Sequence, residues 1–231
     1  MRLFYDANIK PGLKFHTLNE DESKHIIRVL RLKMGDKIGL LNGKGDFFEC
    51  EIVEDLPKKC GLHVLSIQQE STPSYSIHIA VGPTKQMDRI EWFIEKATEI
   101  GITEITLLDC ENGERGKIKT DRLLRKAISA MKQSHRKFLP VINDLTSFND
   151  FIEKYPNGLI AHCYDSDKGN FEDAFQMMNC PILIGPEGDF TEKEIELAIN
   201  KGYKTVTLGK NRLRTETAAL YACMRAKLLT E

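Results

Sequence analysis

The spacing of hydrophobic residues changes near residue 70 and predicts different structures on the two sides. Before that point, apolar residues form short runs separated by turn sequences such as Leu56-Pro57, which is typical of β-strands. The exception is segment 20–31, where Ile26, Ile27 and Leu30 share one side of a predicted helix. Strands are expected at 37–41, 46–53 and 62–68, with a strand and turn in 1–10. Short strands around a small core favour a β-barrel.

From Tyr75 onward, apolar strand-like runs alternate with helical periodicity. Ile90, Phe93, Ile94 and Ala97 have the spacing of one helix face, and Gly101 follows at the position of a C-cap. Further strands are expected at 77–81, 104–108, 158–163, 181–184 and 205–208, with helices from Thr120, after a Thr191–Glu194 capping box and from Glu216. This alternation predicts a mostly parallel α/β sheet. We therefore predict a β-barrel in residues 1–70, a linker at 71–74 and an α/β domain in residues 75–231.

Charge is balanced over the chain but not along it. The 231 residues carry a formal net charge of −1, so any nucleic-acid binding has to come from local patches. Segment 114–138 holds nine Lys/Arg and two acidic residues, a surplus of seven, which suits a phosphate backbone but also a solvated face. A smaller N-terminal group comprises Lys24, His25, Arg28, Arg31, Lys33 and Lys37. Two patches in two domains favour a clamp on one RNA.

Several classes of protein are disfavoured. No apolar run approaches the roughly 20 residues of a membrane span, and residues 1–10 do not read as an export signal. The six cysteines have no CxxC spacing and no paired histidines, which argues against a zinc site. A disulfide framework is not expected in a chain of this length without an export signal. They are Cys50, Cys60, Cys110, Cys163, Cys180 and Cys223. We expect buried or half-buried free thiols in a cytoplasmic protein.

Two glycine-containing segments follow predicted strands. In Ile184-Gly185-Pro186-Glu187-Gly188, glycines would let a ligand approach the backbone beyond a strand's carboxyl end. The segment matches neither a dinucleotide fingerprint nor a Walker loop, and an ordinary tight turn explains it equally well. In the second segment, Gly209 ends a strand, and Arg212 and Arg214 alternate with an inward-pointing Leu213. A solvated loop with an N-cap at Thr215 is the alternative.

Together these segments resemble the RsmE-type family, the bacterial 16S rRNA (uracil-N3)-methyltransferases of the SPOUT superfamily, over nearly the whole chain. The resemblance rests on five ordered motifs: His25 to Arg31 with Gly35-Asp36; Glu95-Lys96-Ala97-Thr98-Glu99-Ile100-Gly101; Gln133-Ser134-His135-Arg136 with Pro140; Ile184 to Gly188; and Leu208-Gly209 with Leu213 to Ala218. Two positions differ from the family pattern. Asp189 replaces a usual glycine, where Asp can tolerate an unusual backbone angle or cap the helix. Arg115-Gly116 replaces a usual Arg-Ser.

The resemblance implies a fold and an activity. The fold is a SPOUT-type, trefoil-knotted, mostly parallel sheet with helices on both faces, preceded by a PUA-like RNA-binding β-barrel. The knot and cofactor site would lie in about residues 182–220. The activity is S-adenosylmethionine-dependent methylation of uridine N3 in 16S ribosomal RNA. The partners would be 16S rRNA or the small ribosomal subunit, and a second copy in a homodimer. The last helix carries apolar residues suited to an interface or to the core: Leu220, Tyr221, Met224, Leu228 and Leu229.

The resemblance also implies roles for particular residues. The residues expected to bind S-adenosylmethionine are Ile184, Gly185, Pro186, Gly188, Leu208, Gly209, Leu213 and Thr217. From the two basic patches, the residues expected to bind RNA are Arg28, Arg31, Arg115, Arg122, Arg125, Lys126 and Arg136. Alkyl transfer from a sulfonium needs no metal, because no oxyanion leaving group has to be neutralised.

Two catalytic residues are expected. Arg214 would stabilise the uridinate that forms when N3 loses its proton, with help from Arg115 or Arg136. Glu216, or alternatively Glu187, would be the general base, although each carboxylate suits a helix cap or salt bridge equally well.

Two other functions remain open. A non-catalytic RNA-binding protein on a SPOUT scaffold is disfavoured by the complete Gly-Pro-Glu-Gly and Leu-Arg-Thr-Glu-Thr loops. An α/β enzyme that uses a small nucleotide without RNA is disfavoured by the two basic patches and the predicted barrel.

Overall fold

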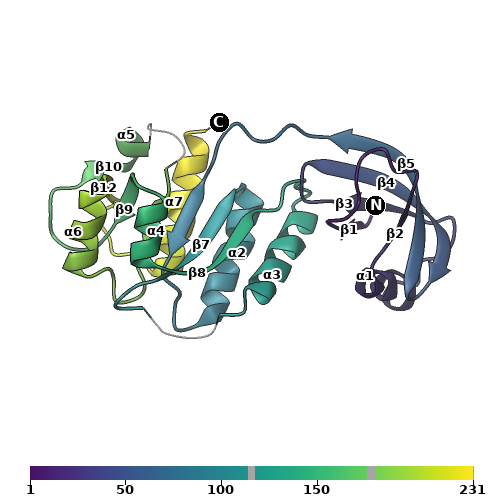
Figure 1. Cartoon of the computed structure of the whole chain (residues 1–231), viewed down its shortest axis with the longest axis horizontal. Coiled ribbons are helices and arrows are strands. Elements are labelled where there is room, and N and C mark those ends of the chain that lie inside the picture. Colours follow the sequence, from purple (N-terminus) through teal and green to yellow (C-terminus); the bar gives the residue numbers. More distant parts are fainter. Residues whose placement is uncertain (114–117, 176–179, 231) are drawn as a thin grey trace. The chain divides into compact units, whose positions relative to one another are not determined.

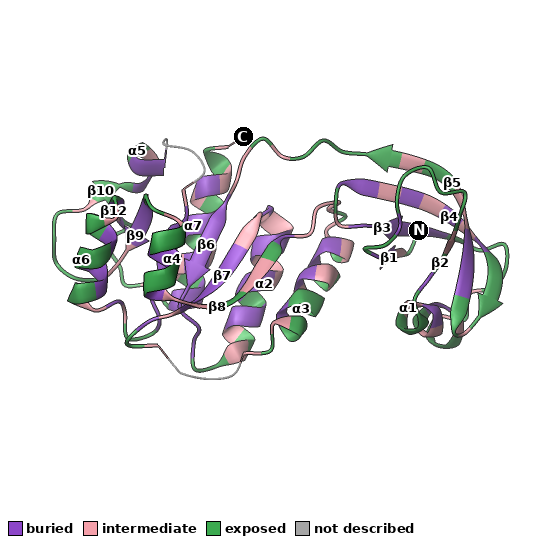
Figure 2. Ribbon diagram, viewed as in Figure 1, coloured by how far each residue is buried: buried purple, intermediate pink, exposed green. Residues whose placement is uncertain are grey.

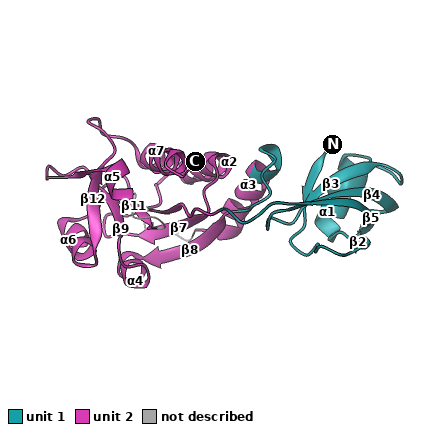
Figure 3. Ribbon diagram, turned by 90° about the horizontal axis from the view of Figure 1, so that it is seen from above, with its two compact units in different colours: residues 1–73, 131–139 teal, residues 74–130, 140–231 magenta. Residues whose placement is uncertain are grey.

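The computed structural model describes residues 1–113, 118–175 and 180–230. These form two compact units, shown in Figure 3. Unit 1 comprises Met1–Pro73 and Met131–Leu139, and unit 2 comprises Ser74–Ala130 and Pro140–Glu231. The chain therefore returns to its N-terminal unit once, which no pattern in the sequence had indicated.

Unit 1 is built on a five-stranded sheet. Its order is β1 (Leu3–Tyr5), β3 (Lys37–Leu41), β4 (Asp46–Leu56), β5 (Lys59–Gln69) and β2 (Phe15–Thr17). β1 pairs with β3 in parallel, and the other pairs are antiparallel. Alternate residues of β4 are buried, so one face of the sheet covers a core that includes Phe4, Ile38 and Phe48. The strands expected at 37–41, 46–53 and 62–68 are confirmed, and β2 was missed.

The helical segment expected at 20–31 is confirmed for residues 20–29, but its second half is π-helical rather than α-helical. An α-helix, α1 (Glu20–Lys24), passes directly into a π-helical turn, η1 (His25–Val29), and Arg31 has a positive φ of 56°. The wider turn leaves Ile26 fully buried in the core while Arg28 and Val29 are exposed. A π-turn depends on hydrogen bonds five residues apart, which the hydrophobic period does not reveal.

The returning segment Met131–Leu139 pairs with the turn between β3 and β4. Gly45 N donates to Lys137 O at 3.0 Å, and Leu139 N donates to Gly43 O at 3.0 Å. Gly45 has a φ of 100°, and a Cβ there would lie 2.5 Å from the Phe138 ring. Glycine is therefore required at this junction.

Unit 2 contains a seven-stranded sheet in which all recorded strand pairs are parallel. Its order is β10 (Gly169–Asn170), β12 (Tyr203–Thr207), β9 (Gly158–Ala161), β11 (Ile182–Ile184), β6 (His78–Val81), β7 (Glu104–Asp109) and β8 (Val141–Ser147). The central strands β6 and β11 are completely buried, as Figure 2 shows for β6. The predicted parallel α/β sheet is confirmed; β8 and β10 had not been predicted.

Helices cover both faces of this sheet. α2 (Met87–Ile100) and α7 (Thr215–Leu228) pack together on one face, whereas α4 (Phe148–Lys154) and α6 (Glu192–Asn200) cover the other (Figures 1 and 3). The remaining helices are α3 (Thr120–Gln133) and the short α5 (Phe171–Phe175). The expected C-cap at Gly101, with φ 111°, and the Thr191–Glu194 capping box are both confirmed.

Candidate functional site

Three loops meet at the carboxyl ends of the adjacent strands β12, β9 and β11. They line two adjoining pockets of about 300 Å³ and 340 Å³, both within unit 2. The pockets share walls formed by Ala161, Cys163, Ile184, Arg212, Leu213 and Ala218. This is the edge of a parallel sheet at which ligands usually bind.

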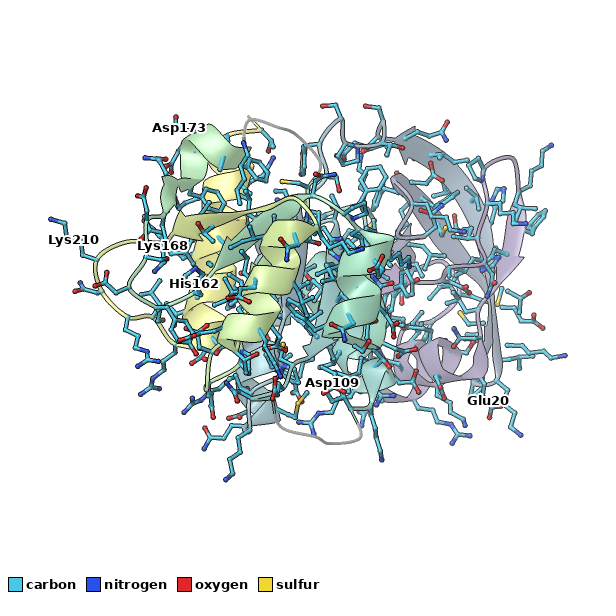
Figure 4. All side chains as sticks on the ribbon, turned by 60° about the vertical axis from the view of Figure 1, so that its left-hand side comes forward. Glu20, Asp109, His162, Lys168, Asp173 and Lys210 are labelled. Carbon is cyan, nitrogen blue, oxygen red and sulfur yellow. The ribbon has the colours of Figure 1, made fainter. Side chains whose placement is uncertain are left out.

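The first pocket is bounded on one side by the loop after β12, from Thr207 to Leu213. Its lining among the described residues includes Lys168, Lys210 and Arg212 but no carboxylate. Figure 4 shows Lys210 extending outward from its loop. The ring of His162 also lines this pocket, and burial, followed by the charge of Lys168, lowers its pKa. An uncharged imidazole at neutral pH follows.

The second pocket is lined by the loop after β11 and by the start of α7. Arg89, from the first turn of α2, forms one wall. Its Nη1 donates to Glu187 Oε1 at 3.2 Å, and its Nε lies 4.0 Å from Glu216 Oε1. Glu216 is 8% exposed and does not itself line either pocket. Arg89 was missed because its partners are distant in the sequence.

Asp189 connects two of the three loops. Its φ is 63°, so the expectation that Asp tolerates an unusual backbone angle here is confirmed. Its Oδ1 accepts from Phe190 N at 2.8 Å and its Oδ2 from Cys163 N at 2.7 Å. The N-cap of α6 is Thr191, so capping is not the role of Asp189.

Cys163 departs from the prediction that all cysteines are buried or half-buried. All six cysteines are free thiols, but Cys163 is exposed because it lies in the loop after β9. Partial burial and the nearby carboxylate of Asp189 raise its pKa, which keeps the thiol protonated at neutral pH.

Most of the residues expected to bind the cofactor line the two pockets. These are Ile184, Gly185, Pro186, Leu208, Gly209 and Leu213. Gly188 does not: a Cβ there would lie 3.1 Å from Asn112 Cβ, and its carbonyl accepts from Asn112 Nδ2 at 3.3 Å. Thr217 is exposed in the first turn of α7 and lines neither pocket. The cofactor roles of Gly188 and Thr217 stay predictions.

Gly82 is another residue near the site that was not predicted. Gly82 N donates to Ile184 O at 2.9 Å, and a Cβ on Gly82 would lie 2.6 Å from Pro186 N. Only glycine lets the end of β6 approach the Gly-Pro turn this closely. The signal was present, since Gly82 directly follows a predicted strand, as Gly185 does.

Arg214 lines the second pocket and is exposed. It occupies the N-cap position of α7 with an extended backbone, so the alternative of an N-cap at Thr215 is wrong. Leu213 is half-buried between the exposed Arg212 and Arg214, as the alternation predicted. Among the described residues, no carboxylate lies within ion-pair distance of Arg214.

The residues expected to bind RNA are divided between the units. Arg28 and Arg31 are exposed in unit 1, Arg136 lies in the returning segment of that unit, and Arg125 is exposed on α3. Arg122 Nε forms an ion pair with the buried Glu91 of α2, and Lys126 Nζ lies 3.5 Å from the same carboxylate. Arg122 and Lys126 therefore have a structural role whatever else they contact. Arg115 lies outside the described residues.

Every helix in the described part of the chain is too short or too polar to span a membrane. In those same residues, no group of three or more His, Cys, Asp or Glu side chains is arranged to hold a metal ion.

Comparison with known proteins identifies relatives over the full length. Residues 70–227 match the model of an RNA methyltransferase domain, and residues 18–60 match an RNA methyltransferase PUA domain. The ribosomal RNA small subunit methyltransferase E of Rickettsia conorii is 30% identical, with 99% of this chain and 95% of that protein covered. The protein of the same name from Bacillus subtilis is 28% identical, with 93% and 90% covered.

Solved structures of related proteins superimpose closely on this chain. A probable rRNA-methyltransferase from Porphyromonas gingivalis is 40% identical and superimposes with a TM-score of 0.89, covering 100% of this chain and 98% of that one. The ribosomal RNA small subunit methyltransferase E of Neisseria gonorrhoeae, bound to S-adenosyl methionine, is 26% identical with a TM-score of 0.85, covering 96% and 95%.

Proposed function

The chain belongs to the RNA methyltransferase family that includes the ribosomal RNA small subunit methyltransferases E, and we propose that it methylates N3 of a uridine in 16S ribosomal RNA with S-adenosylmethionine as the methyl donor. The observation that carries this proposal is the pair of adjoining pockets formed by the loops after β9, β11 and β12. Ribosomal RNA of the small subunit is proposed as the substrate because the relatives are ribosomal RNA small subunit methyltransferases. Uridine N3 is proposed as the methylated atom because of the motif resemblance.

The lining of the pockets fits such a cofactor. Ile184, Leu213 and Ala218 offer apolar walls to an adenine ring, while the backbone at Gly185 and Gly209 is open to polar groups. A Cβ on Gly209 would meet no atom within 4 Å, so that side of the loop is free space. Each pocket lies near the lower limit for a small-molecule site, and the two share six lining residues, so we propose that the cofactor occupies both.

When bound, S-adenosylmethionine supplies a methyl group on a positively charged sulfur, which is left as a neutral thioether. N3 of uridine holds a proton at neutral pH, so that proton has to be removed before the nitrogen lone pair can form the new bond. We assign this step to Glu216, which directly follows the pocket-lining Thr215 and whose Oε2 is buried with no hydrogen-bond partner among the described residues. Glu187, the alternative expected from the sequence, is ion-paired with Arg89 and is not assigned this step.

Arg214 is assigned the stabilisation of the uridinate. Its guanidinium is always charged and is positioned at the second pocket by the start of α7. Since the negative charge on the pyrimidine develops only on the way to methyl transfer, a fixed cation there favours the transition state over the ground state.

RNA contacts are proposed on both units. Of the residues expected to bind RNA, the exposed Arg28, Arg31 and Arg125 are the best candidates, because they form no ion pair with any described residue. Arg31 holds a positive φ, a conformation that is often retained where function needs it.

A homodimer and a knot are part of the proposal. Tyr221, Met224, Leu228 and Leu229 at the end of the chain are 43–70% exposed, so core packing does not account for them. The trefoil knot is proposed from the family resemblance, and the strand order, with β11 between the earlier strands β6 and β9, is compatible with it. Two domains with boundaries near 1–70 and 75–231 are likewise proposed.

The decisive experiment is methyl transfer by the purified chain. We expect incubation with S-adenosylmethionine and 16S rRNA, or with small subunits from cells lacking the gene, to yield N3-methyluridine on nucleoside mass spectrometry. Methylation at another atom or on another RNA would contradict the substrate assignment. RNA binding without any calorimetric binding of S-adenosylmethionine would instead favour a non-catalytic RNA-binding protein.

A further inference from the structure

Five charged side chains line the second pocket, and a sixth, that of Glu216, lies beside it against Arg89; three of the six are basic and three acidic. The six residues are Arg89, Arg212, Arg214, Glu187, Asp189 and Glu216. The carboxylates of Glu187 and Glu216 both face Arg89, at 3.2 Å and 4.0 Å. The carboxylate of Asp189 is occupied by two backbone N–H groups. All three acids are thus engaged away from Arg214.

This pairing matters because Glu187 and Arg214 line the same pocket. A carboxylate released beside Arg214 would pair with it and cancel much of the positive potential that a developing anion would feel. The effect would be larger within a pocket closed by substrate, since exclusion of water weakens screening.

Arg89 is well placed to prevent this. It lies in the first turn of α2, and α2 packs against α7, the helix that begins directly after Arg214. Its side chain is 28% exposed, and its guanidinium contacts the loop after β11 and the first turn of α7 together. A guanidinium is planar and carries five N–H donors, so it can engage two carboxylates at once in a fixed geometry.

We propose that Arg89 is a positioning residue that engages Glu187, and more weakly Glu216, so that the charge of Arg214 remains available to the uridinate. This inference rests on the proposed function. Arg89 itself does not have to touch the RNA base or the cofactor, and its effect on the reaction is exerted through Glu187.

The test compares single and double variants by their single-turnover methylation rate at saturating RNA and S-adenosylmethionine. Arg89→Met should lower that rate by about 10-fold, less than the loss expected for Arg214 itself. Adding Glu187→Gln to Arg89→Met should restore most of the lost rate, because the released charge is then gone. Arg89→Lys should lie between wild type and Arg89→Met.

Lys96→Met is the matched control, because Lys96 lies on the same helix and also pairs with two acids, Glu95 and Glu99. Its rate should equal that of wild type. A wild-type rate in Arg89→Met, or a double variant no faster than Arg89→Met, would overturn the proposal. If Arg89→Met weakens only RNA binding, Arg89 contacts a phosphate instead. If it lowers both Tm and the rate, and Glu187→Gln restores neither, Arg89 has only a structural role. If wild type forms no N3-methyluridine, the proposed function has failed rather than this inference.

Discussion

Single residues around the second pocket set the electrostatics of the proposed reaction, and Arg214 is the one expected to act on substrate. We predict that Arg214→Ala lowers kcat by about 10²-fold, by analogy with the loss of an oxyanion-hole donor. Affinities for S-adenosylmethionine and RNA should change little, because the interaction forms mainly in the transition state. Single-turnover rates at saturating substrates measure this directly. A normal rate with weakened RNA binding would instead assign Arg214 to a phosphate.

Asp189 allows a second prediction at this scale. Asp189→Gly removes two side-chain hydrogen bonds but relieves a backbone φ of 63°, whereas Asp189→Ala removes the same bonds and keeps the strain. The alanine variant should therefore be less stable than the glycine variant by about 1 kcal/mol in urea unfolding. Both should bind S-adenosylmethionine more weakly than wild type, since the loop after β9 loses its tether. Equal stabilities would mean that the backbone at this position relaxes.

The residues that sequence reasoning found and those it missed differ in a physical way. Gly185, Gly209 and Leu213 lie in loops directly after apolar strands, so a local pattern is enough to locate them. Arg89 stands in an ordinary amphipathic helix, and its partner Glu187 is 98 residues away in the chain. Only the strand order brings them together.

At the scale of elements, hydrophobic periodicity located those with clear apolar faces and missed those without them. β11 is a continuous apolar run, β6 is apolar except for His78, and α2 has an unbroken helical stripe, so their prediction was straightforward. β8 is half polar, with no residue fully buried, and β2 and β10 have only three and two residues. Such strands are defined by pairing with a neighbour rather than by their own composition.

A buried polar cluster connects several of these elements and gives a pH prediction. His78 Nε2 lies 2.8 Å from Thr106 Oγ1, and Asn143 Nδ2 donates to Thr106 Oγ1 at 2.9 Å and to Glu104 at 2.7 Å, joining β6, β7 and β8. Burial lowers the pKa of His78 to about 4, opposed by the charge of Glu104 and assisted by that of Lys154.

Because this pKa is lower in the folded chain than in the unfolded chain, the unfolded state gains a proton first as pH falls. Stability should be unaffected by His78 above about pH 6.5, decline as pH falls from there to about 4, and then level off. The slope is at most about 1.4 kcal/mol per pH unit. Urea unfolding at pH 7 and pH 5 measures it, with His78→Gln as the comparison. A variant with an undiminished pH dependence would exclude His78 as its source.

At the scale of the whole molecule, the proposed homodimer is testable through the exposed end of the chain. Met224 and Leu228 are 46% and 70% exposed on α7. A charge placed at an apolar interface is costly, so Met224→Lys with Leu228→Lys should convert a dimer to a monomer in sedimentation velocity at micromolar concentration. Leu124→Lys, an exposed leucine on α3, is the control and should leave the dimer intact. A wild-type chain that sediments as a fully active monomer would end the dimer proposal.

Both units are proposed to bind RNA. The salt dependence of RNA affinity reports how many phosphates are contacted. Each phosphate contact contributes roughly 0.7 to 0.9 units to the log–log slope of affinity against salt. Replacing Arg28 and Arg31 with Gln should therefore flatten that slope by about 1.5 units, because both side chains are exposed. Lys10→Gln with Lys14→Gln removes the same charge from exposed positions of the same unit and should change the slope much less.

The basic residues of α3 should behave differently, although the sequence alone groups them with the others. Arg122 and Lys126 both pair with Glu91, which is 5% exposed, so replacing them with Gln leaves a buried carboxylate unpaired. The double variant should lose thermal stability while its salt slope changes by less than that of the Arg28 and Arg31 variant. Arg125→Gln, with no recorded partner among the described residues, should instead flatten the slope by one contact at unchanged Tm. A slope equal to that of wild type in both the Arg28 and Arg31 variant and the Arg125 variant would mean that neither basic patch contacts RNA.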